Sequence, residues 1–333
     1  MMTLKQKIKS SPFLARPAWF LYREVLLQRS RHPAKGRVPV FSEETRLTFS
    51  RLRTYEDFQQ FSQDRVEELH DQERVESDLS PLQHKSFSIS GTCALCGCDT
   101  TFKTNFDYSI RSSDGRSIPN FREHLFCVRC GLKNRLRAAL QLFIQEFHPL
   151  STQPIYITEQ FGAAYRWLKG RGYAISGSEY IPGSGPFGSS PRGIRNEDLG
   201  ALTWPSEMFD FVLSFDVLEH VPSVDACFSE IFRCLRPQGK LLFTAPFSPN
   251  LSKTLIRAVM QSDGSISHLM EPEYHGGNMI DAAKGTLCFR YFAWDVLPQL
   301  KEIGFSDAEA WLFWSRKLGY LGGTQIVIVA QKG

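Results

Sequence analysis

The sequence predicts an α/β protein with a doubly wound sheet, preceded by a small cysteine-bearing module and a helical N-terminal segment. In residues 151–333, short apolar runs alternate with helical stretches, which is the pattern of parallel strands joined by crossover helices. The run Phe209–Phe215 is nearly continuous in apolar residues, as expected for a strand covered on both faces. Upstream, four cysteines occur in two CxxC pairs. We therefore divide the chain into residues 1–85, 86–150 and 151–333.

The elements of residues 151–333 can be assigned in order. Apolar runs predict strands at 155–158, 173–179, 209–215, 240–246 and 325–330. Helical spacing predicts helices at 163–169, 224–235 and 295–303. Residues 183–195, rich in Gly, Ser and Pro, predict a loop.

Composition limits the class of protein. With 333 residues, 42% of them hydrophobic and 22% charged, the chain is not collagen-like, disordered or a cysteine scaffold. No stretch approaches the roughly 18 uninterrupted apolar residues of a spanning helix, and we expect a cytoplasmic protein. The net charge of +4 is too small to indicate nucleic-acid binding by itself.

Charge is unevenly distributed over residues 1–85, which we interpret as a basic and then acidic helical segment. Residues 1–40 carry nine Lys or Arg against one acid, and residues 41–80 carry eleven acids against five Arg. An amphipathic stretch in residues 17–29 predicts one of two contacts: peripheral binding to an anionic membrane surface, or packing on the protein's own core.

The cysteine pairs of residues 86–150 form a zinc-ribbon-like pattern. Cys93 and Cys96 make one CxxC knuckle, Cys127 and Cys130 make the other, and each is followed by a glycine that permits a tight turn. Four thiolates suit a tetrahedral Zn²⁺ and leave no position for water, which predicts a structural ion. The alternative is four buried free cysteines. Cys98 is interpreted as a bystander.

The segment after the second knuckle has two interpretations. It carries basic residues that offer charge to nucleic-acid phosphates: Arg129, Lys133, Arg135 and Arg137. It also carries apolar residues at the spacing of a helix packed on the neighbouring domain: Leu132, Leu136, Ala139, Leu140 and Phe143.

The stretch 205–222 carries the most specific motif of the chain. There an apolar strand runs into Asp216 and then Leu-Glu-His-Val-Pro, and a helix leads to Leu235-Arg-Pro-Gln-Gly. This stretch resembles the class I S-adenosylmethionine-dependent methyltransferases, in the branch with a VLEHV-type fourth strand. The resemblance covers residues 154–246 and implies a Rossmann-like methyltransferase sheet that binds S-adenosylmethionine. A nicotinamide oxidoreductase is disfavoured because GxGxxG is absent.

The first motif of this family is only partly present. Gly162 matches its last glycine, whereas Thr158 and Gln160 take the places of the first two. By the resemblance, Glu159 on this turn is expected to hold the cofactor's ammonium. Glu179, at the end of the second strand, is expected to accept both ribose hydroxyls, or else it is a loop cap.

Later positions complete the cofactor site that the resemblance implies. Asp198 and Leu199 fall where the family contacts the adenine, although Asp198 also suits a surface acid. Asp216 ends a central strand, where open α/β sheets bind ligands. The full cofactor-binding set comprises Glu159, Phe161, Gly162, Glu179, Tyr180, Asp198, Leu199, Phe215 and Asp216.

Two histidines are candidate bases for methyl transfer to a hydroxyl. His220 follows the fourth strand, and His275 lies in a polar segment after the fifth. A structural hydrogen bond for His220 and a loop contact for His275 are the alternatives. Residues 268–295 mix aromatic and polar groups, which suits a small-molecule or glycan acceptor. An RNA methyltransferase using its zinc ribbon, and a non-catalytic interaction protein, stay open.

Overall fold

The computed structural model describes residues 38–81, 85–111, 115–276 and 285–333. The predicted amphipathic stretch, residues 17–29, lies outside these ranges. Within them, no helix combines the length and the apolar character needed to cross a membrane.

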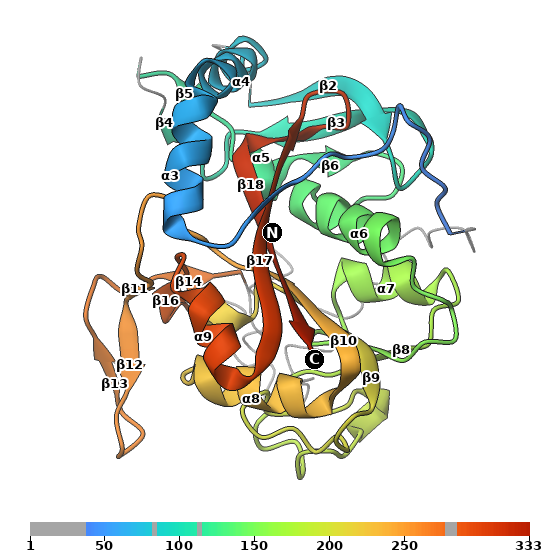
Figure 1. The fold of residues 1–333 in the computed structure, drawn as a ribbon, viewed down its shortest axis with the longest axis vertical. Helices are drawn as coiled ribbons and strands as arrows, with labels where there is room; N and C mark the ends of the chain where they lie inside the picture. The colour runs from blue at the N-terminus through green and yellow to red at the C-terminus, as the bar shows by residue number, and fades with distance from the viewer. Residues whose placement is uncertain (1–37, 82–84, 112–114, 277–284) are drawn as a thin grey trace, which may run out of the picture.

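A seven-stranded mixed sheet forms the centre of the molecule (Figure 1). Its strands, in spatial order, are β1 (Ser50–Leu52), β17 (Phe305–Ser315), β18 (Tyr320–Lys332), β10 (Leu235–Thr244), β9 (Phe209–Phe215), β7 (Ile155–Ile157) and β8 (Ile175–Gly177). Strands β8, β7, β9 and β10 are parallel, and β18, β17 and β1 add antiparallel pairings. From β7 the chain continues to β8 on one side of β7 and then crosses to β9 on the other side. The winding direction of the sheet therefore reverses at the boundary between β7 and β9.

Helices cover both faces of this sheet. Along β9 the side chains alternate between two hydrophobic cores, as the period of two along a strand requires. Phe211 packs edge-to-face against Phe143 of α6 (Asn134–Phe147) on one face, with α7 (Ala163–Lys169) beside it. Val212 faces the other core, which α8 (Val224–Cys234) and α9 (Val296–Ile303) cover. The doubly wound prediction is confirmed.

The predicted elements of residues 151–333 are confirmed, but two strands of the central sheet, β17 and β1, and the short strands within residues 255–291 (β11–β16) were not predicted. β17 is interrupted by Asp307 and Glu309, so its residues lack a strict apolar alternation. β1 has only three residues and lies in the acidic segment, where only α3 (Tyr55–Asp64) and α4 (Val66–Asp78) match the helical prediction. Its place at the sheet edge depends on contacts with β17: the two strands pair, and the Arg51 guanidinium lies 3.7 Å from the ring centroid of Trp311 of β17.

The cysteine module is a small antiparallel sheet that packs on the end of the β17–β18 hairpin (Figure 1). Its strands are β2 (Ser86–Cys93), β3 (Cys98–Asn105) and β6 (Phe126–Cys127), with β4 (Ile110–Arg111), β5 (Ser117–Ile118) and α5 (Phe121–His124) between them. Phe102 of β3 is fully buried against Gly319 of the hairpin, where a Cβ would come within 2.4 Å of its ring. The domain boundary near residue 150 stays a prediction.

Helix α6 connects this module to the sheet, which confirms the packing interpretation of its apolar spacing. A polar stripe on the same helix is also buried. Arg137 donates to the carbonyls of Leu318 and Gly319 at 2.8 and 2.6 Å, and Gln141 accepts from the hydroxyl of Tyr320 at 2.7 Å. These hydrogen bonds give partners to polar groups at the turn of the β17–β18 hairpin.

An insertion of short hairpins lies between β10 and α9. It pairs β11 (Leu255–Ile256) with β16 (Arg290–Tyr291), β12 (Ala258–Met260) with β13 (Ile266–His268), and β14 (Tyr274–His275) with β15 (Thr286–Leu287). In Figure 1 the β12–β13 hairpin projects from the side of the molecule.

Phe102→Ala tests the contact between the cysteine module and the sheet. Removing this buried ring is expected to lower the free energy of unfolding by about 3–5 kcal/mol, measured by urea denaturation. Ile110→Ala, at a 59% exposed position of the same module, serves as control and is expected to change it by about 0.5 kcal/mol or less. Equal losses in both variants would contradict this packing.

Candidate active site

Polar residues gather at the carboxyl ends of β7, β8 and β9, where the winding of the sheet reverses. Thr158 and Glu159 follow β7, Glu179 lies two residues after β8, and Asp216 directly follows β9. Open α/β sheets bind ligands at this kind of position, because no helix covers the crevice between strands that are followed in opposite directions.

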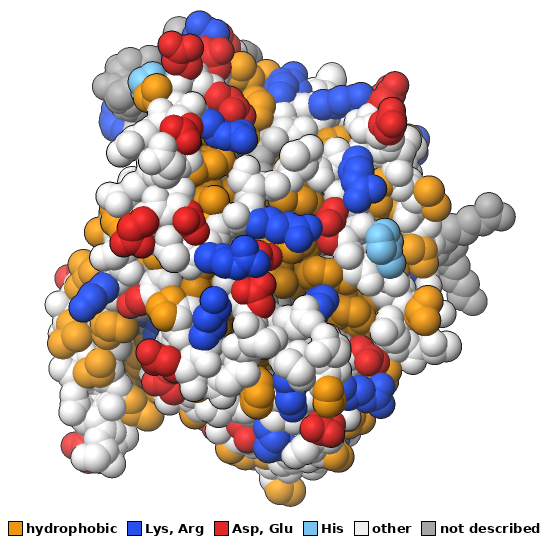
Figure 2. All heavy atoms as spheres, viewed as in Figure 1, with side chains coloured by type: hydrophobic (Ala, Val, Ile, Leu, Met, Phe, Trp, Pro, Cys, Tyr) orange, Lys and Arg blue, Asp and Glu red, His pale blue; other side chains and the backbone are white. Residues whose placement is uncertain are grey.

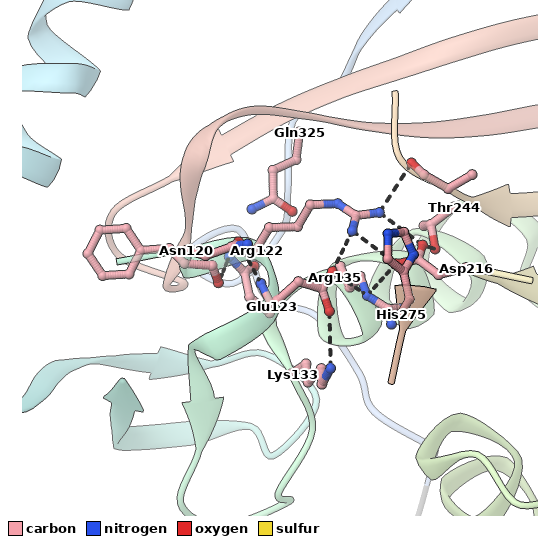
Figure 3. Close-up of polar contacts among 12 residues, drawn as sticks. Asn120, Arg122, Glu123, Lys133, Arg135, Asp216, Thr244, His275 and Gln325 are labelled. Carbon is pink, nitrogen blue, oxygen red and sulfur yellow. Dashed lines mark hydrogen bonds and ion pairs between the residues drawn. The ribbon is translucent and has the colours of Figure 1, made fainter. Parts of the chain in front are cut away.

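Asp216 lies in the middle of a network of ion pairs at this edge of the sheet (Figure 3). Its two carboxylate oxygens each accept from Arg122 of α5 at 2.9 Å, and Arg135 of α6 adds a contact of 2.9 Å. The hydroxyl of Thr244 on β10 donates to it at 2.8 Å. Burial alone would raise the pKa of Asp216, but the two guanidinium groups outweigh it and lower that pKa. Asp216 is thus ionised and paired.

Glu123 of α5 extends this network into the cysteine module. It accepts from Arg122, from the Nε of Arg135 at 2.8 Å and from the Nζ of Lys133 at 3.0 Å. Burial raises the pKa of Glu123, and the neighbouring arginines reverse the shift and lower it. Arg122 and Glu123 were missed by sequence reasoning, because nothing in the local pattern of residues 118–126 places them at the sheet.

Glu159 and Glu179 lie at the same edge of the sheet. Glu179 accepts at 2.8 and 2.7 Å from the backbone N–H groups of Gln160 and Phe161, the turn after β7. Burial raises its pKa to about 7. Burial also raises the pKa of Glu159 to about 7, although the nearby charges of Arg135, Arg166 and Lys133 lower it in part.

The other predicted cofactor residues lie around this turn. Gly162 precedes α7 as its N-cap, and Phe215 is buried at the end of β9. Leu199 is buried. Asp198 accepts from the backbone N–H of Gly200 at 2.8 Å, a contact within its own loop. The ring of Tyr180 is 55% exposed.

The two candidate histidines meet, although 54 residues separate them in the chain. His220 ends the short helix η2 (Leu218–His220) after β9, and His275 lies on β14. Their ring centroids are 5.1 Å apart. Between them lies Glu219, whose Oε1 is 3.5 Å from His220 Nε2 and 3.9 Å from His275 Nδ1. Glu219 belongs to the quoted motif, but sequence reasoning gave it no role.

The four predicted cysteines form one cluster. Their sulfurs lie within 4.8 Å of one another, and the Sγ separations are 4.0 Å for Cys93 and Cys130 and 3.9 Å for Cys96 and Cys127. Four sulfurs about 2.3 Å from one tetrahedral ion would be about 3.8 Å apart. The glycine after each pair has a positive φ, as the tight-turn prediction requires.

Comparison with known proteins identifies the fold around the crevice. A family model described as a methyltransferase domain matches residues 160–243, which include the turn after β7, Glu179 and Asp216. The chain carries a class I S-adenosylmethionine-dependent methyltransferase domain. The four-cysteine cluster lies N-terminal to this methyltransferase domain.

Solved methyltransferase structures show limited similarity to this chain. The 1,6-didemethyltoxoflavin-N1-methyltransferase of Burkholderia thailandensis is 16% identical, with 59% of this chain and 77% of that chain covered and a TM-score of 0.36. An S-adenosylmethionine-dependent methyltransferase from Mesorhizobium loti is 18% identical, with 58% and 98% covered and a TM-score of 0.36. No curated protein gives a significant match.

The raised pKa values of Glu159 and Glu179 predict how stability depends on pH. Both values lie near 7 in the folded protein and near 4.5 in the unfolded chain, so the folded state binds more protons between these limits. The free energy of unfolding is therefore expected to fall, by about 1–3 kcal/mol per group, as pH rises from 4.5 to 7. Urea titrations at pH 5 and 8 measure this change.

The double variant Glu159→Gln/Glu179→Gln isolates the contribution of these two groups. It is expected to lose less stability between pH 5 and 8 than the unmodified protein. Glu302→Gln, which changes an exposed acid on α9, is the control and is expected to show the full loss of stability between pH 5 and 8. An unchanged pH response in the double variant would contradict the assignment.

Proposed function

We propose that this methyltransferase transfers the methyl group of S-adenosylmethionine to a hydroxyl of a small-molecule or glycan acceptor. The observation that carries the proposal is the meeting of His220, in the segment after β9, with His275 of β14, next to the acid Glu219. A hydroxyl acceptor requires a group that takes its proton, and neutral imidazole serves this purpose near pH 7.

The donors and acceptors at the carboxyl ends of β7, β8 and β9 suit the polar groups of S-adenosylmethionine. Glu179 has one carboxylate oxygen on backbone N–H groups, which leaves the other for ribose hydroxyls. Glu159 offers a carboxylate to an ammonium. The Nη1 atom of Arg135 is buried without a hydrogen-bond partner among the described residues, and so offers a donor to a carboxylate. These complementary groups support the cofactor site despite the incomplete glycine motif.

The histidines supply proton transfer in this proposal. When bound, S-adenosylmethionine supplies an electrophilic methyl group on a sulfonium. Nδ1 of His220 lies 2.8 Å from the carbonyl oxygen of Leu287 and donates to it, so Nε2 keeps a lone pair. That lone pair takes the acceptor proton as the new O–C bond forms and the S–C bond breaks. Positioning of the two reactants supplies the rest of the rate increase.

The insertion beside His275 offers apolar surface to an acceptor. Its exposed large side chains are Ile256, Met260, Ile266, Leu269, Met270 and Tyr274. Figure 2 shows apolar side chains gathered where the insertion projects. Apolar surface with a few polar groups suits the faces of a sugar or an aromatic ring.

An RNA acceptor has less support from the basic residues after the second knuckle. The guanidinium of Arg137 is fully buried on backbone carbonyls, and Arg135 and Lys133 are paired with acids. On the face shown in Figure 2, basic and acidic side chains are interspersed. Salt-sensitive binding of RNA would contradict the small-molecule proposal.

We further propose that the four-cysteine cluster binds a structural Zn²⁺, in a protein that acts in the reducing cytoplasm. All four sulfurs are used by such an ion, so it would stabilise the module that carries Arg122 rather than take part in the chemistry. Peripheral membrane contact through residues 1–40 stays a prediction from the sequence.

Calorimetric titration with S-adenosylmethionine and S-adenosylhomocysteine tests the cofactor site. Glu179→Ala is expected to weaken binding at least tenfold, about 1.4 kcal/mol, whereas the exposed-acid control Glu302→Ala is expected to bind normally. Affinity is expected to rise as pH increases through about 7, because the ionised carboxylate is the form that accepts from the ribose. Absence of binding at millimolar cofactor would refute the proposed enzyme.

Metal analysis of Cys127→Ser tests the zinc proposal. This variant is expected to lose the tightly bound zinc and to unfold at lower urea concentration, because a tetrahedral site needs all four sulfurs. Cys98→Ser, next to the first knuckle, is the matched control and is expected to keep one zinc per chain. Purified protein without zinc, at full stability, would contradict the proposal.

A further inference from the structure

Glu219 is a buried acid that the hydrogen bonds of the described residues do not satisfy. Its side chain has no exposed surface, and neither carboxylate oxygen has a hydrogen-bond partner in that part of the chain. Removing a carboxylate from water without a compensating partner is costly. A group of this kind is stable when a proton or a cation occupies the space that it faces.

Each imidazole turns one ring nitrogen toward this carboxylate. His220 donates its Nδ1 proton to the carbonyl of Leu287, which leaves Nε2 on the side of Glu219. His275 bonds through Nε2 to the carboxylate of Glu273 at 2.7 Å, which leaves Nδ1 on the side of Glu219. Two ring nitrogens and a carboxylate oxygen therefore converge, and in neutral imidazoles with these outer hydrogen bonds both nitrogens offer a lone pair.

The separations suit three ligands of one ion. Oε1 of Glu219 is 3.5 Å from His220 Nε2 and 3.9 Å from His275 Nδ1, and all three ligand atoms lie within 4.8 Å of one another. Ligands about 2.1 Å from a shared ion would be about 3.0–3.4 Å apart. The two distances from Glu219 exceed the upper value by only 0.1 and 0.5 Å, a difference that side-chain movement can supply.

We infer that Glu219, His220 and His275 bind a divalent first-row transition metal ion. Two imidazoles and one carboxylate on one side of an ion leave positions open for water or substrate oxygen. The hard carboxylate and the imidazoles accept Mn²⁺, Fe²⁺ or Zn²⁺, whereas the four-thiolate cluster selects softer ions. This second site is independent of the proposed structural zinc.

Groups behind the ligands hold them in this orientation. Histidine ligands ordinarily donate their other N–H to a carbonyl or a carboxylate, and the two histidines here have one partner of each kind. Glu273 is in turn held by the hydroxyl of Tyr291 and by Arg257 at 3.1 Å. These contacts fix both rings before an ion arrives.

The two arginines that interact with Glu219 among the described residues do not take the place of the ion. Arg290 donates to the backbone carbonyls of Leu218 and Pro222. Burial lowers the pKa of Arg122, and the charges of Asp216 and Glu123 outweigh burial and raise it. Glu219 lies close enough to add a smaller rise. The guanidinium of Arg122, however, donates to Asp216, to Glu123 and to the carbonyl of Ala245. The carboxylate of Glu219 stays available.

The ion would lie where the acceptor hydroxyl is proposed to bind. This location relative to the acceptor rests on the proposed function, whereas binding of the ion does not. A divalent ion there would lower the pKa of a hydroxyl bound to it and so ease loss of the hydroxyl proton. With the ion bound, the two imidazoles would act as ligands, whereas in the metal-free protein His220 is the proposed base.

Electron paramagnetic resonance of Mn²⁺ tests the site in the full chain that carries one zinc, in the four-cysteine cluster, with all other zinc removed beforehand because Zn²⁺ would compete for this site. Titration is expected to show the free Mn²⁺ signal suppressed until one ion is bound per chain. Glu219→Gln and His275→Gln each remove one ligand and are expected to abolish this binding. His275 is 31% exposed, so its variant tests the site even where the change at buried Glu219 disturbs folding.

Matched changes behind and beside the ligands refine the result. Glu273→Gln is expected to weaken Mn²⁺ binding about 10–100-fold, since it only supports His275. Glu271→Gln makes the same chemical change at an exposed position two residues away and is expected to leave binding unaltered. Absence of Mn²⁺ binding in the unmodified protein, or equal binding in all variants, would overturn the site.

Calorimetry separates this proposal from the proposed function. S-adenosylmethionine is expected to bind Glu219→Gln as well as the unmodified protein, because Glu179 and Glu159 hold the cofactor. If the unmodified protein binds Mn²⁺ but does not bind S-adenosylmethionine, the methyl-transfer proposal is refuted and the ion site is still supported.

Discussion

The paired charges of Asp216, Arg122 and Arg135 join the cysteine module to the sheet. Asp216 lies at the end of a central strand in a left-handed conformation, with φ of 55°, and both of its oxygens meet guanidinium groups from the module side. A buried carboxylate needs this compensation, and a buried guanidinium needs the carboxylate. The rest of the crevice, from Glu159 to the histidines, is arranged around this charge-compensated centre.

This arrangement gives the upstream module a place in the catalytic domain. Helix α6 begins next to the second cysteine knuckle and covers the sheet through Phe143, so the knuckle, the helix and the crevice form one packed unit. A structural ion in the cluster would therefore act on the crevice indirectly, because it would fix α5 and the start of α6. The module carries arginines to the crevice rather than a free basic surface.

Sequence reasoning succeeded where the signal is local and periodic. The apolar run of β9 and the helical spacing of α8 gave their elements directly, and the duplicated CxxC spacing gave the cysteine cluster. It failed for β1, because three residues carry no period, and for β17, because Asp307 and Glu309 interrupt its pattern. Both strands depend on pairing with a neighbour that lies far away in the sequence.

The sequence by itself determined the methyltransferase domain, because strand–helix alternation and the motif around Asp216 are properties of consecutive residues. It also singled out His220 and His275, though as separate candidates. Only the tertiary structure decided that these two histidines meet at Glu219 and that Arg122 reaches the crevice. The physical reason is that convergence of side chains on one buried point depends on how distant elements pack, and no local period encodes it.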